Sequence, residues 1–178
     1  IDFSTPYGCS KGSADLYFLD YFKSYGIDLT VFRHSTMYGG RQFATVDQGW
    51  IGFFCEKLIE PLDQEIDIYG IGKQVRDILH CDDIVSLYYK SINKFDNLKG
   101  QAFNIGGGPK NSISLLELFD KLESKTGNEM RYRTNPMRVS DQKVYISDIG
   151  KISEALSWSP EVSIDSGLDM MLSWVRNK

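Results

Sequence analysis

A tyrosine and a lysine four residues apart stand near the start of the chain, in the run Tyr7-Gly8-Cys9-Ser10-Lys11. On a helix, this spacing places the phenol and the ammonium on one face. A phenol ionises near pH ~10, but a neighbouring cation favours the phenolate and lowers its pKa. Such a pair could remove the proton of a sugar or alcohol hydroxyl while a hydride leaves the carbon. The spacing alone does not distinguish this chemistry from an ordinary surface pair.

Two arginines could bind a charged ligand. Arg76 stands within the strand-like run 74–80, and Arg138 precedes Asp141 by three positions. A diphosphate is bound best by forked, permanently charged donors, which arginine supplies. A surface ion pair is the alternative for either arginine. Asp77, next to Arg76, is interpreted as a structural partner rather than a catalyst.

Histidines, cysteines and aromatic residues are assigned structural roles by default. His34 and His80 are interpreted as hydrogen-bonded structural residues that form no ligand cluster. The cysteines are three in number and far apart, so neither a disulfide framework nor a zinc site is expected. We therefore expect no metal. An aromatic stripe could line a pocket for a nucleotide base, although core packing is commoner; it consists of Trp50, Phe53 and Phe54.

Charge and hydropathy exclude several classes of partner. The 178 residues contain 20 Lys and Arg against 24 Asp and Glu, so the net charge is -4. A mildly acidic chain has no general attraction to nucleic acid or to anionic membranes, and neither is an expected partner. No apolar run approaches the ~18 residues of a membrane span, and no signal peptide is recognised. A cytoplasmic location is expected.

The elements that must position these residues alternate between helix and strand, which predicts a mixed α/β fold. Apolar spacing predicts a helix over Tyr7–Tyr25, which Gly26 ends as a C-cap residue. Further helices are expected from Asp47, from Asp82 or Asp83, after the capping box Ser114–Glu117, and over 165–176. Strands are expected over 29–34, 65–69, 74–80, 102–105, 130–133 and 143–146. The run Gly106–Asn111 is interpreted as a tight turn from strand to helix.

Four blocks of the chain, in order, resemble the extended short-chain dehydrogenase/reductase family of nucleotide-sugar epimerases and dehydratases. They are Thr5–Asp15 (TPYGCSKGSAD), Arg33–Phe43 (RHSTMYGGRQF), Tyr69–Val85 (YGIGKQVRDILHCDDIV) and Ala102–Gly108 (AFNIGGG). The runs Arg41–Phe54 and Met137–Gln142 favour a subgroup of 2-epimerases that act on CDP-sugars. The resemblance covers essentially the whole chain, although Gly40 departs from the family's commoner Tyr-Gly-Pro.

The resemblance implies a fold and a division into domains. The chain would be the C-terminal part of an NAD(P)-binding Rossmann-fold enzyme. Residues 1–46 would be the last piece of the cofactor domain, and 47–178 mainly the nucleotide-sugar domain, with some segments returning to the first. The chain starts without Met, and it lacks the glycine-rich loop that binds a dinucleotide pyrophosphate. We expect that loop and a catalytic Ser or Thr upstream, since Ser4 and Thr5 cannot be assigned that role.

The same resemblance implies residue roles. Tyr7 would be the catalytic base, and Lys11 would assist it and bind the nicotinamide ribose. The remaining roles are cofactor binding for His34, Ser35 and Met37, sugar binding for Thr36, diphosphate binding for Arg76, and nucleotide binding for Arg138 and Asp141. The cofactor would be NAD, and the substrate a nucleotide sugar of the CDP type.

The implied reaction is epimerisation by transient oxidation to a ketone, with the hydride returned to the opposite face. Alternatives are a sister 4-epimerase, a 4,6-dehydratase or a decarboxylase on another sugar nucleotide. A non-catalytic, nucleotide-binding regulatory member of the family is a further alternative, which the intact pair of Tyr7 and Lys11 argues against. Helix Tyr7–Tyr25 is apolar on two sides, so we expect a homo-oligomer formed partly through it. The sheet against which this helix should pack is expected upstream, so an apolar strip would be exposed here unless a partner covers it; the strip is Phe18, Tyr21, Phe22 and Tyr25.

Overall fold

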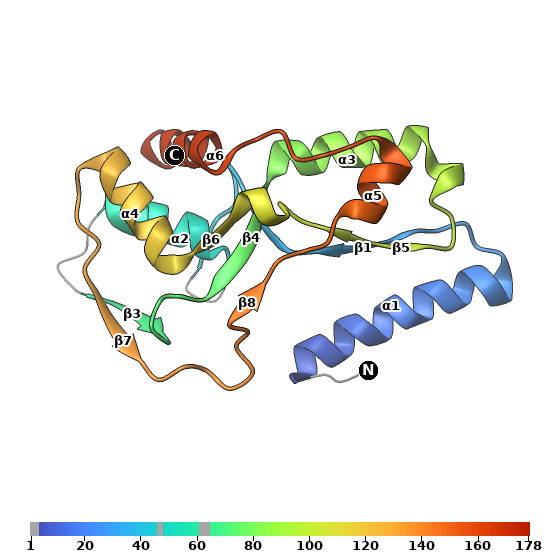
Figure 1. Cartoon of the computed structure of the whole chain (residues 1–178), viewed down its shortest axis with the longest axis horizontal. Helices are drawn as coiled ribbons and strands as arrows, with labels where there is room; N and C mark the ends of the chain where they lie inside the picture. The colour runs from blue at the N-terminus through green and yellow to red at the C-terminus, as the bar shows by residue number, and fades with distance from the viewer. Residues whose placement is uncertain (1–3, 46–47, 61–64) are drawn as a thin grey trace.

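The computed structural model describes residues 4–45, 48–60 and 65–178 (Figure 1). Its helices are α1 (Pro6–Tyr25), α2 (Trp50–Ile59), α3 (Cys81–Asn93), α4 (Leu115–Thr126), α5 (Gly150–Leu156) and α6 (Ile164–Arg176). Its strands are β1 (Val31–His34), β2 (Thr36–Tyr38), β3 (Ile66–Tyr69), β4 (Val75–His80), β5 (Ala102–Ile105), β6 (Ser112–Ser114), β7 (Tyr132–Asn135) and β8 (Val144–Tyr145). The predicted mixed α/β class is confirmed.

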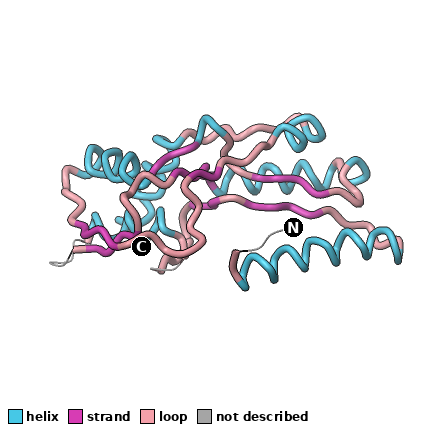
Figure 2. The backbone as a smooth tube through the Cα atoms, turned by 60° about the horizontal axis from the view of Figure 1, so that its bottom comes forward, coloured by secondary structure: helices cyan, strands magenta, loops and turns pink. Residues whose placement is uncertain are grey.

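The first half of the architecture is a parallel pair of strands between two layers of helices. β1 pairs with β5 in the register Val31 to Ala102. Helix α1 lies on one side of this pair, and α3 and α5 lie on the other, as Figures 1 and 2 both show. Buried apolar residues between the pair and the helices α3 and α5 form one core, which includes Leu87, Phe103 and Ile152.

The second half is a larger sheet covered by three packed helices. The strand order is β2-β4-β6, and β8 pairs with β4 on a branch of that path. Helices α2, α4 and α6 contact one another and close a second core, which includes Phe54, Leu118 and Leu172. β4 contributes to both cores, because Ile78 lies in the second core and its neighbour Leu79 in the first. A separate two-stranded parallel sheet joins β3 to β7.

Helix α1 has clear signals at both ends. Thr5 is the N-cap, and its Oγ1 accepts a hydrogen bond of 3.0 Å from the Gly8 N–H. Pro6 follows within the first turn, where its missing N–H costs nothing, and Gly26 ends the helix in the left-handed conformation. The expected helix over 7–25 is therefore confirmed, and it begins one residue earlier.

The apolar strip of α1 is largely exposed. The exposed fractions are 54% for Phe18, 43% for Tyr21 and 70% for Tyr25, and the helix has no buried residue. Phe22 is the exception, because it is half-buried and its ring packs against Gly100. An ion pair of 2.6 Å between Asp15 and Arg33 also joins α1 to β1. The predicted exposure is thus confirmed for three of the four residues.

Several expected boundaries differ from the structure. The expected helix start at Asp47 lies outside the described residues, and α2 begins at Trp50. Strand β7 begins two residues later than expected. Pro109–Asn111 form a 3-10 turn, followed by the short strand β6 before α4, so the tight turn directly from strand to helix was wrong. The division into 1–46 and 47–178 stays a prediction, because its boundary also falls outside the described residues.

None of the helices among the described residues is long and apolar enough to cross a membrane.

Candidate active site

A cleft of about 830 Å³ lies between helix α1 and strand β1, and the residues that follow β1 also line it. Its lining includes all five residues expected to serve catalysis or cofactor binding: Tyr7, Lys11, His34, Ser35 and Met37. Residues up to 30 positions apart therefore reach one hollow, because β1 runs alongside the helix that carries the first two. Thr36, the residue expected to contact the sugar, begins β2 and is half-buried. Their roles stay predictions.

Tyr7 and Lys11 lie in the first turns of α1 and face the cleft together. The Lys11 Nζ atom is 5.5 Å from the centre of the Tyr7 ring, a cation-π distance. Tyr7 is 70% exposed, so a substrate could reach its hydroxyl. Thr5 uses its hydroxyl oxygen to cap the helix, which gives this side chain a structural task.

His34 contributes a partly buried imidazole to the same cleft. Its Nε2 atom lies 2.8 Å from the hydroxyl oxygen of Tyr88, so the predicted hydrogen-bonded role is confirmed. The Nδ1 atom is buried and has no partner among the described residues. Burial lowers the pKa of His34, which favours the neutral ring at pH 7. A neutral imidazole can accept or donate one hydrogen bond at a bound ligand.

Ser35 and Asp77 are connected at the inner end of the cleft. The Ser35 hydroxyl donates to the Asp77 carboxylate, and the backbone N–H of Gly108 donates to it at 3.1 Å. Asp77 therefore has hydrogen-bond partners, as a structural residue would, but the expected pairing with Arg76 is wrong because Arg76 pairs with Asp141. The side chain of Asp77 does not meet that of its neighbour Arg76, because consecutive side chains on a strand point to opposite faces.

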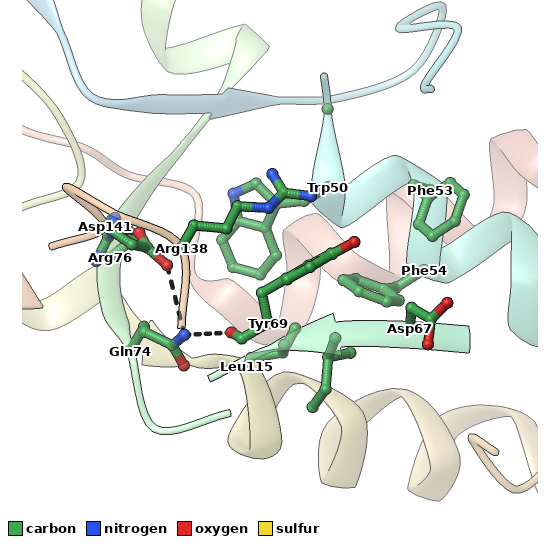
Figure 3. A pocket seen from close by; sticks show the side chains of 12 residues that line it. Trp50, Phe53, Phe54, Asp67, Tyr69, Gln74, Arg76, Leu115, Arg138 and Asp141 are labelled. Carbon is green, nitrogen blue, oxygen red and sulfur yellow. Dashed lines mark hydrogen bonds and ion pairs between the residues drawn. The ribbon is translucent and has the colours of Figure 1, made fainter. Parts of the chain in front are cut away.

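A second hollow, of about 280 Å³, gathers the residues expected to bind substrate (Figure 3). Its polar lining includes Arg76 and Gln74 from β4 and the preceding turn, and Arg138 and Asp141 from the loop after β7. Its apolar lining includes Trp50, Phe53, Phe54, Ile68, Tyr69 and Leu115. Phe54 is also buried in the core, so the aromatic stripe both lines the hollow and packs in the core, and base binding stays a prediction.

The charged side chains Arg76 and Asp141 of this hollow are held by hydrogen bonds within the protein. The Nη2 atom of Arg76 lies 3.0 Å from Oδ1 of Asp141, and its Nη1 atom donates to the Val75 carbonyl at 2.8 Å. Gln74 donates from Nε2 to the Tyr69 carbonyl and, at 3.5 Å, to Asp141 Oδ2. Asp141 therefore orients the arginine, and a bound phosphate would compete for a guanidinium that is held in place.

Arg138 lies flat over an aromatic ring in the same hollow. Its guanidinium carbon is 4.1 Å from the centre of the Tyr69 ring (Figure 3). Tyr69 and Gln74 were not among the site residues predicted from the sequence. Their position beside the Gly70–Gly72 turn, within a block already singled out for Arg76, was an available signal.

The rim of the hollow is fixed by an ion pair between β3 and β7. Asp67 accepts hydrogen bonds from Arg133 at 2.6 and 3.0 Å and from Asn135 at 2.9 Å. These donors lower the pKa of Asp67 to about 2. The pair joins two strands that stand far apart in the sequence, and it keeps Tyr69 at the edge of the hollow.

Metal binding finds little support in the structure. In the described part of the chain, His80, Cys81 and Asp82 bring potential ligand atoms within 4.8 Å of one another, which the sequence analysis did not anticipate. However, His80 Nδ1 accepts the Asp82 N–H at 3.3 Å and caps α3. This geometry is that of a helix N-terminus, and the expected absence of a metal stays a prediction.

Comparison with known proteins shows which family this chain matches. The model of the NAD dependent epimerase/dehydratase family matches residues 2–106. The chain is 51% identical to the CDP-paratose 2-epimerase of Salmonella typhi, over 98% of the chain and 52% of that protein. The chain thus spans about half the length of the curated relatives it matches.

Two solved epimerase structures superpose closely on this chain. A UDP-glucose 4-epimerase of Thermotoga maritima, solved with UDP-glucose, superposes with a TM-score of 0.86 at 31% identity over 97% of this chain and 53% of that one. A UDP-glucuronic acid 4-epimerase of Bacillus cereus, solved with UDP-glucuronic acid and NAD, superposes with a TM-score of 0.88 at 28% identity, over 98% and 53%.

Proposed function

The chain belongs to the NAD dependent epimerase/dehydratase family, and we propose that the intact protein is an epimerase that inverts C2 of the sugar of a CDP-sugar. The observation that carries the proposal is the 51% identity to a CDP-paratose 2-epimerase, against 31% to a putative UDP-glucose 4-epimerase of Methanocaldococcus jannaschii. The geometry supports it, because one chain combines a Tyr-Lys cleft with a hollow lined by two arginines and several aromatic side chains.

The cleft beside α1 fits a nicotinamide cofactor in chemistry and in size. It has a volume of about 830 Å³, and a buried His34 nitrogen without a partner among the described residues lies at its lining. We assign Lys11 to the nicotinamide ribose, and His34, Ser35 and Met37 to the nicotinamide end. When bound, NAD supplies a reversible hydride acceptor for the reacting carbon.

In the proposed mechanism, Tyr7 removes the proton of the C2 hydroxyl as the C2 hydride departs, which leaves a ketone at C2. Lys11 would assist from the same face of α1, with its Nζ atom 5.5 Å from the centre of the Tyr7 ring. Return of the hydride to the opposite face of C2 would be supplied by the bound cofactor, and Tyr7 would give the proton back to the oxygen. The sum is an isomerisation with no net oxidation. Thr36 would contact the sugar during both steps.

The hollow beside β4 would bind the nucleotide end. Arg76 would bind the diphosphate, since its guanidinium is a permanent cation with paired donors. Arg138 and Asp141 would contact the nucleotide, with the aromatic side chains of α2 nearby to pack against a base. Binding energy from this end could be used to orient the sugar at Tyr7.

We also infer a homo-oligomer formed partly through α1. Large apolar side chains are exposed along this helix, and each would gain about 1.5–3 kcal/mol on full burial; they include Leu16, Tyr17, Phe18, Tyr21 and Tyr25. A second copy would cover them. We place the reaction in the cytoplasm, a setting consistent with the free thiols of Cys9, Cys55 and Cys81.

The test is incubation of the intact enzyme with CDP-, UDP- and dTDP-sugars, followed by proton NMR of the sugar ring. Inversion at C2 of a CDP-sugar is the expected result, and the Tyr7→Phe enzyme is the control. A 4-epimer, a 4-keto-6-deoxy product or a decarboxylated sugar would replace the proposal by one of the sister activities. Binding of a nucleotide sugar with no turnover of any would favour a regulatory member of the family.

A further inference from the structure

The chain changes from one sheet to the other at a single residue. β1 ends at His34 and pairs with β5, whereas β2 begins at Thr36 and pairs with β4. Ser35 stands between them, and its N–H donates to the Ile105 carbonyl at 2.8 Å. This crossover also forms part of the cleft lining, so its position decides where the cofactor end of the site lies.

A buried carboxylate fixes this crossover. Asp77 has no exposed surface, and its carboxylate accepts the hydroxyl of Ser35 and the N–H of Gly108. Its backbone carbonyl also accepts the Ser35 hydroxyl, at 3.0 Å. Side chain and main chain of one residue on β4 thus bind the crossover and the end of the β5 segment together.

The space around this carboxylate is closed. A Cβ atom at Gly106 would collide with the Asp77 carboxylate, and one at Gly107 would collide with the Ile78 carbonyl. The chain after β5 therefore passes directly over Asp77. Such close packing leaves no room for the crossover to shift while its hydrogen bonds remain.

The two faces of β4 serve different sites. Arg76 and Ile78 lie on the face of the second core and the substrate hollow, whereas Asp77 and Leu79 lie on the face of the β1–β5 core. One peptide unit separates the residue assigned to the diphosphate from the residue that anchors the cleft. A rigid strand with both anchors sets the distance from one end of the substrate to the other.

We propose that Asp77 is a positioning residue, which anchors the Ser35 crossover and thereby places the Tyr7 cleft at the correct distance from the Arg76 hollow. The proposal rests on the function proposed above. It predicts a defect in turnover rather than in nucleotide binding, because Arg76, Arg138 and Asp141 do not contact the crossover. A misplacement of about 1 Å can lower the rate of a chemical step about 10²-fold.

The experiment compares Asp77→Asn with Asp83→Asn in the intact enzyme. Asp83 is a matched control, because it is also a buried carboxylate and accepts two backbone N–H groups, from Glu161 at 2.9 Å and Val162 at 3.1 Å. It lies away from both hollows. The expected result for Asp77→Asn is a kcat about 10²-fold lower, with the Kd for CDP within about threefold of the wild type by calorimetry. Asp83→Asn should retain kcat within about threefold of the wild type, even where it lowers the melting temperature as much as Asp77→Asn does.

A second variant, Ser35→Ala, keeps the test decisive if Asp77→Asn fails to fold. It should lower kcat without changing the Kd for CDP, and the double variant should be no worse than the more severe single one. A kcat within about threefold of the wild type in both single variants would overturn the proposal. Additive losses, or an equal loss of kcat in Asp83→Asn, would also overturn it.

The fluorescence of bound NADH separates this proposal from the function itself. It reports the nicotinamide environment whether or not a sugar turns over. Ser35→Ala and Asp77→Asn should change it, and Asp83→Asn should not. If the wild type fails to invert C2 of a CDP-sugar, the proposed function is wrong. The fluorescence comparison then still decides whether Asp77 positions the cleft.

Discussion

The cleft beside α1 and the hollow beside β4 are built in opposite ways. In the cleft, Tyr7 and Lys11 are neighbours on one helix, and both are exposed. In the hollow, Arg76 meets Asp141 across 65 positions of sequence, and Arg138 of the loop after β7 lies over the ring of Tyr69 on β3. Helical spacing is therefore enough to pair the groups for chemistry, whereas the binding site depends on long-range folding.

The difference matches what each end must do. A proton transfer needs one reachable base with a cation nearby, and exposure gives the substrate access. A diphosphate nucleotide needs several donors that converge, and an ordered hollow loses little side-chain entropy when it binds. On the proposed assignment, the hollow would bind the nucleotide with side chains arranged in advance, and the cleft would stay open for the chemistry.

The largest effect on kcat is expected for a substitution in the cleft beside α1. Tyr7→Phe removes the proposed base, and general-base catalysis contributes about 10²–10⁴-fold to a rate. Steady-state kinetics on the intact enzyme should show a loss of kcat in that range, while calorimetry shows CDP binding unchanged. A loss below about tenfold would remove Tyr7 from the catalytic role.

In the hollow beside β4, a substitution should change the Kd for the nucleotide instead of kcat. Arg76→Ala should weaken binding of CDP or a CDP-sugar by about 1.5–3 kcal/mol, which is about 10- to 100-fold in Kd. The affinity for NAD should not change. Arg131→Ala is the control, since that exposed arginine lines neither the hollow nor the cleft and should change the Kd by less than about threefold. Equal weakening of CDP and NAD binding would indicate general misfolding.

A smaller effect separates the stacked ring from its hydroxyl. Tyr69→Ala removes the surface under Arg138 and should weaken CDP binding about 3- to 10-fold, the scale of a partly exposed cation-π contact. Tyr69→Phe keeps the ring and should bind CDP as the wild type does. Identical losses in the two variants, measured by calorimetry, would show that the hydroxyl matters and the stack does not.

The smallest effect concerns pH and again distinguishes the two ends. Burial lowers the pKa of His34 in the cleft, and it also lowers that of His80, against an opposing effect of Asp82 and Asp83. The unfolded chain, with a value near ~6.5, then binds more protons than the folded one. Stability is full above pH ~6.5 and falls as the pH drops through the lower folded values.

Urea unfolding at pH 7.5 and 5.5 should detect this loss. His80→Asn keeps an acceptor for the Asp82 N–H at the start of α3 and should reduce the pH dependence, as should His34→Gln. If neither variant changes the difference between the two pH values, carboxylates rather than these imidazoles cause it.

Local signals in the sequence predicted most elements, and tertiary pairing explains the failures. The capping box Ser114–Glu117 and the C-cap residue Gly26 are read from a few residues. β2 has three residues and exists because β4 lies alongside it. α5 was missed because it starts at a glycine and has no side-chain cap, so packing in the core stabilises it.

In the candidate site, too, local spacing could be read from the sequence, whereas contacts between distant segments could not. The pair of Tyr7 and Lys11 is visible from spacing, but Arg138 and Asp141 were assigned through a family resemblance. The stack of Arg138 on Tyr69 depends on the pairing of β3 with β7, which no local pattern encodes. The partners of Asp77 were missed although strand alternation excluded its neighbour as one.

The parallel pairings have a consequence for the order of folding. Asp67 and Arg133 are 66 positions apart, and Thr30 and Gln101, beside the β1–β5 pair, are 71 apart. Closing such loops costs entropy before any contact repays it, so these pairings should form late. On the ribosome, the substrate hollow cannot close until Asp141 has emerged, whereas α1 can form as soon as Gly26 is free. In refolding experiments, helical circular dichroism should therefore recover before CDP binding does, and simultaneous recovery would contradict this order.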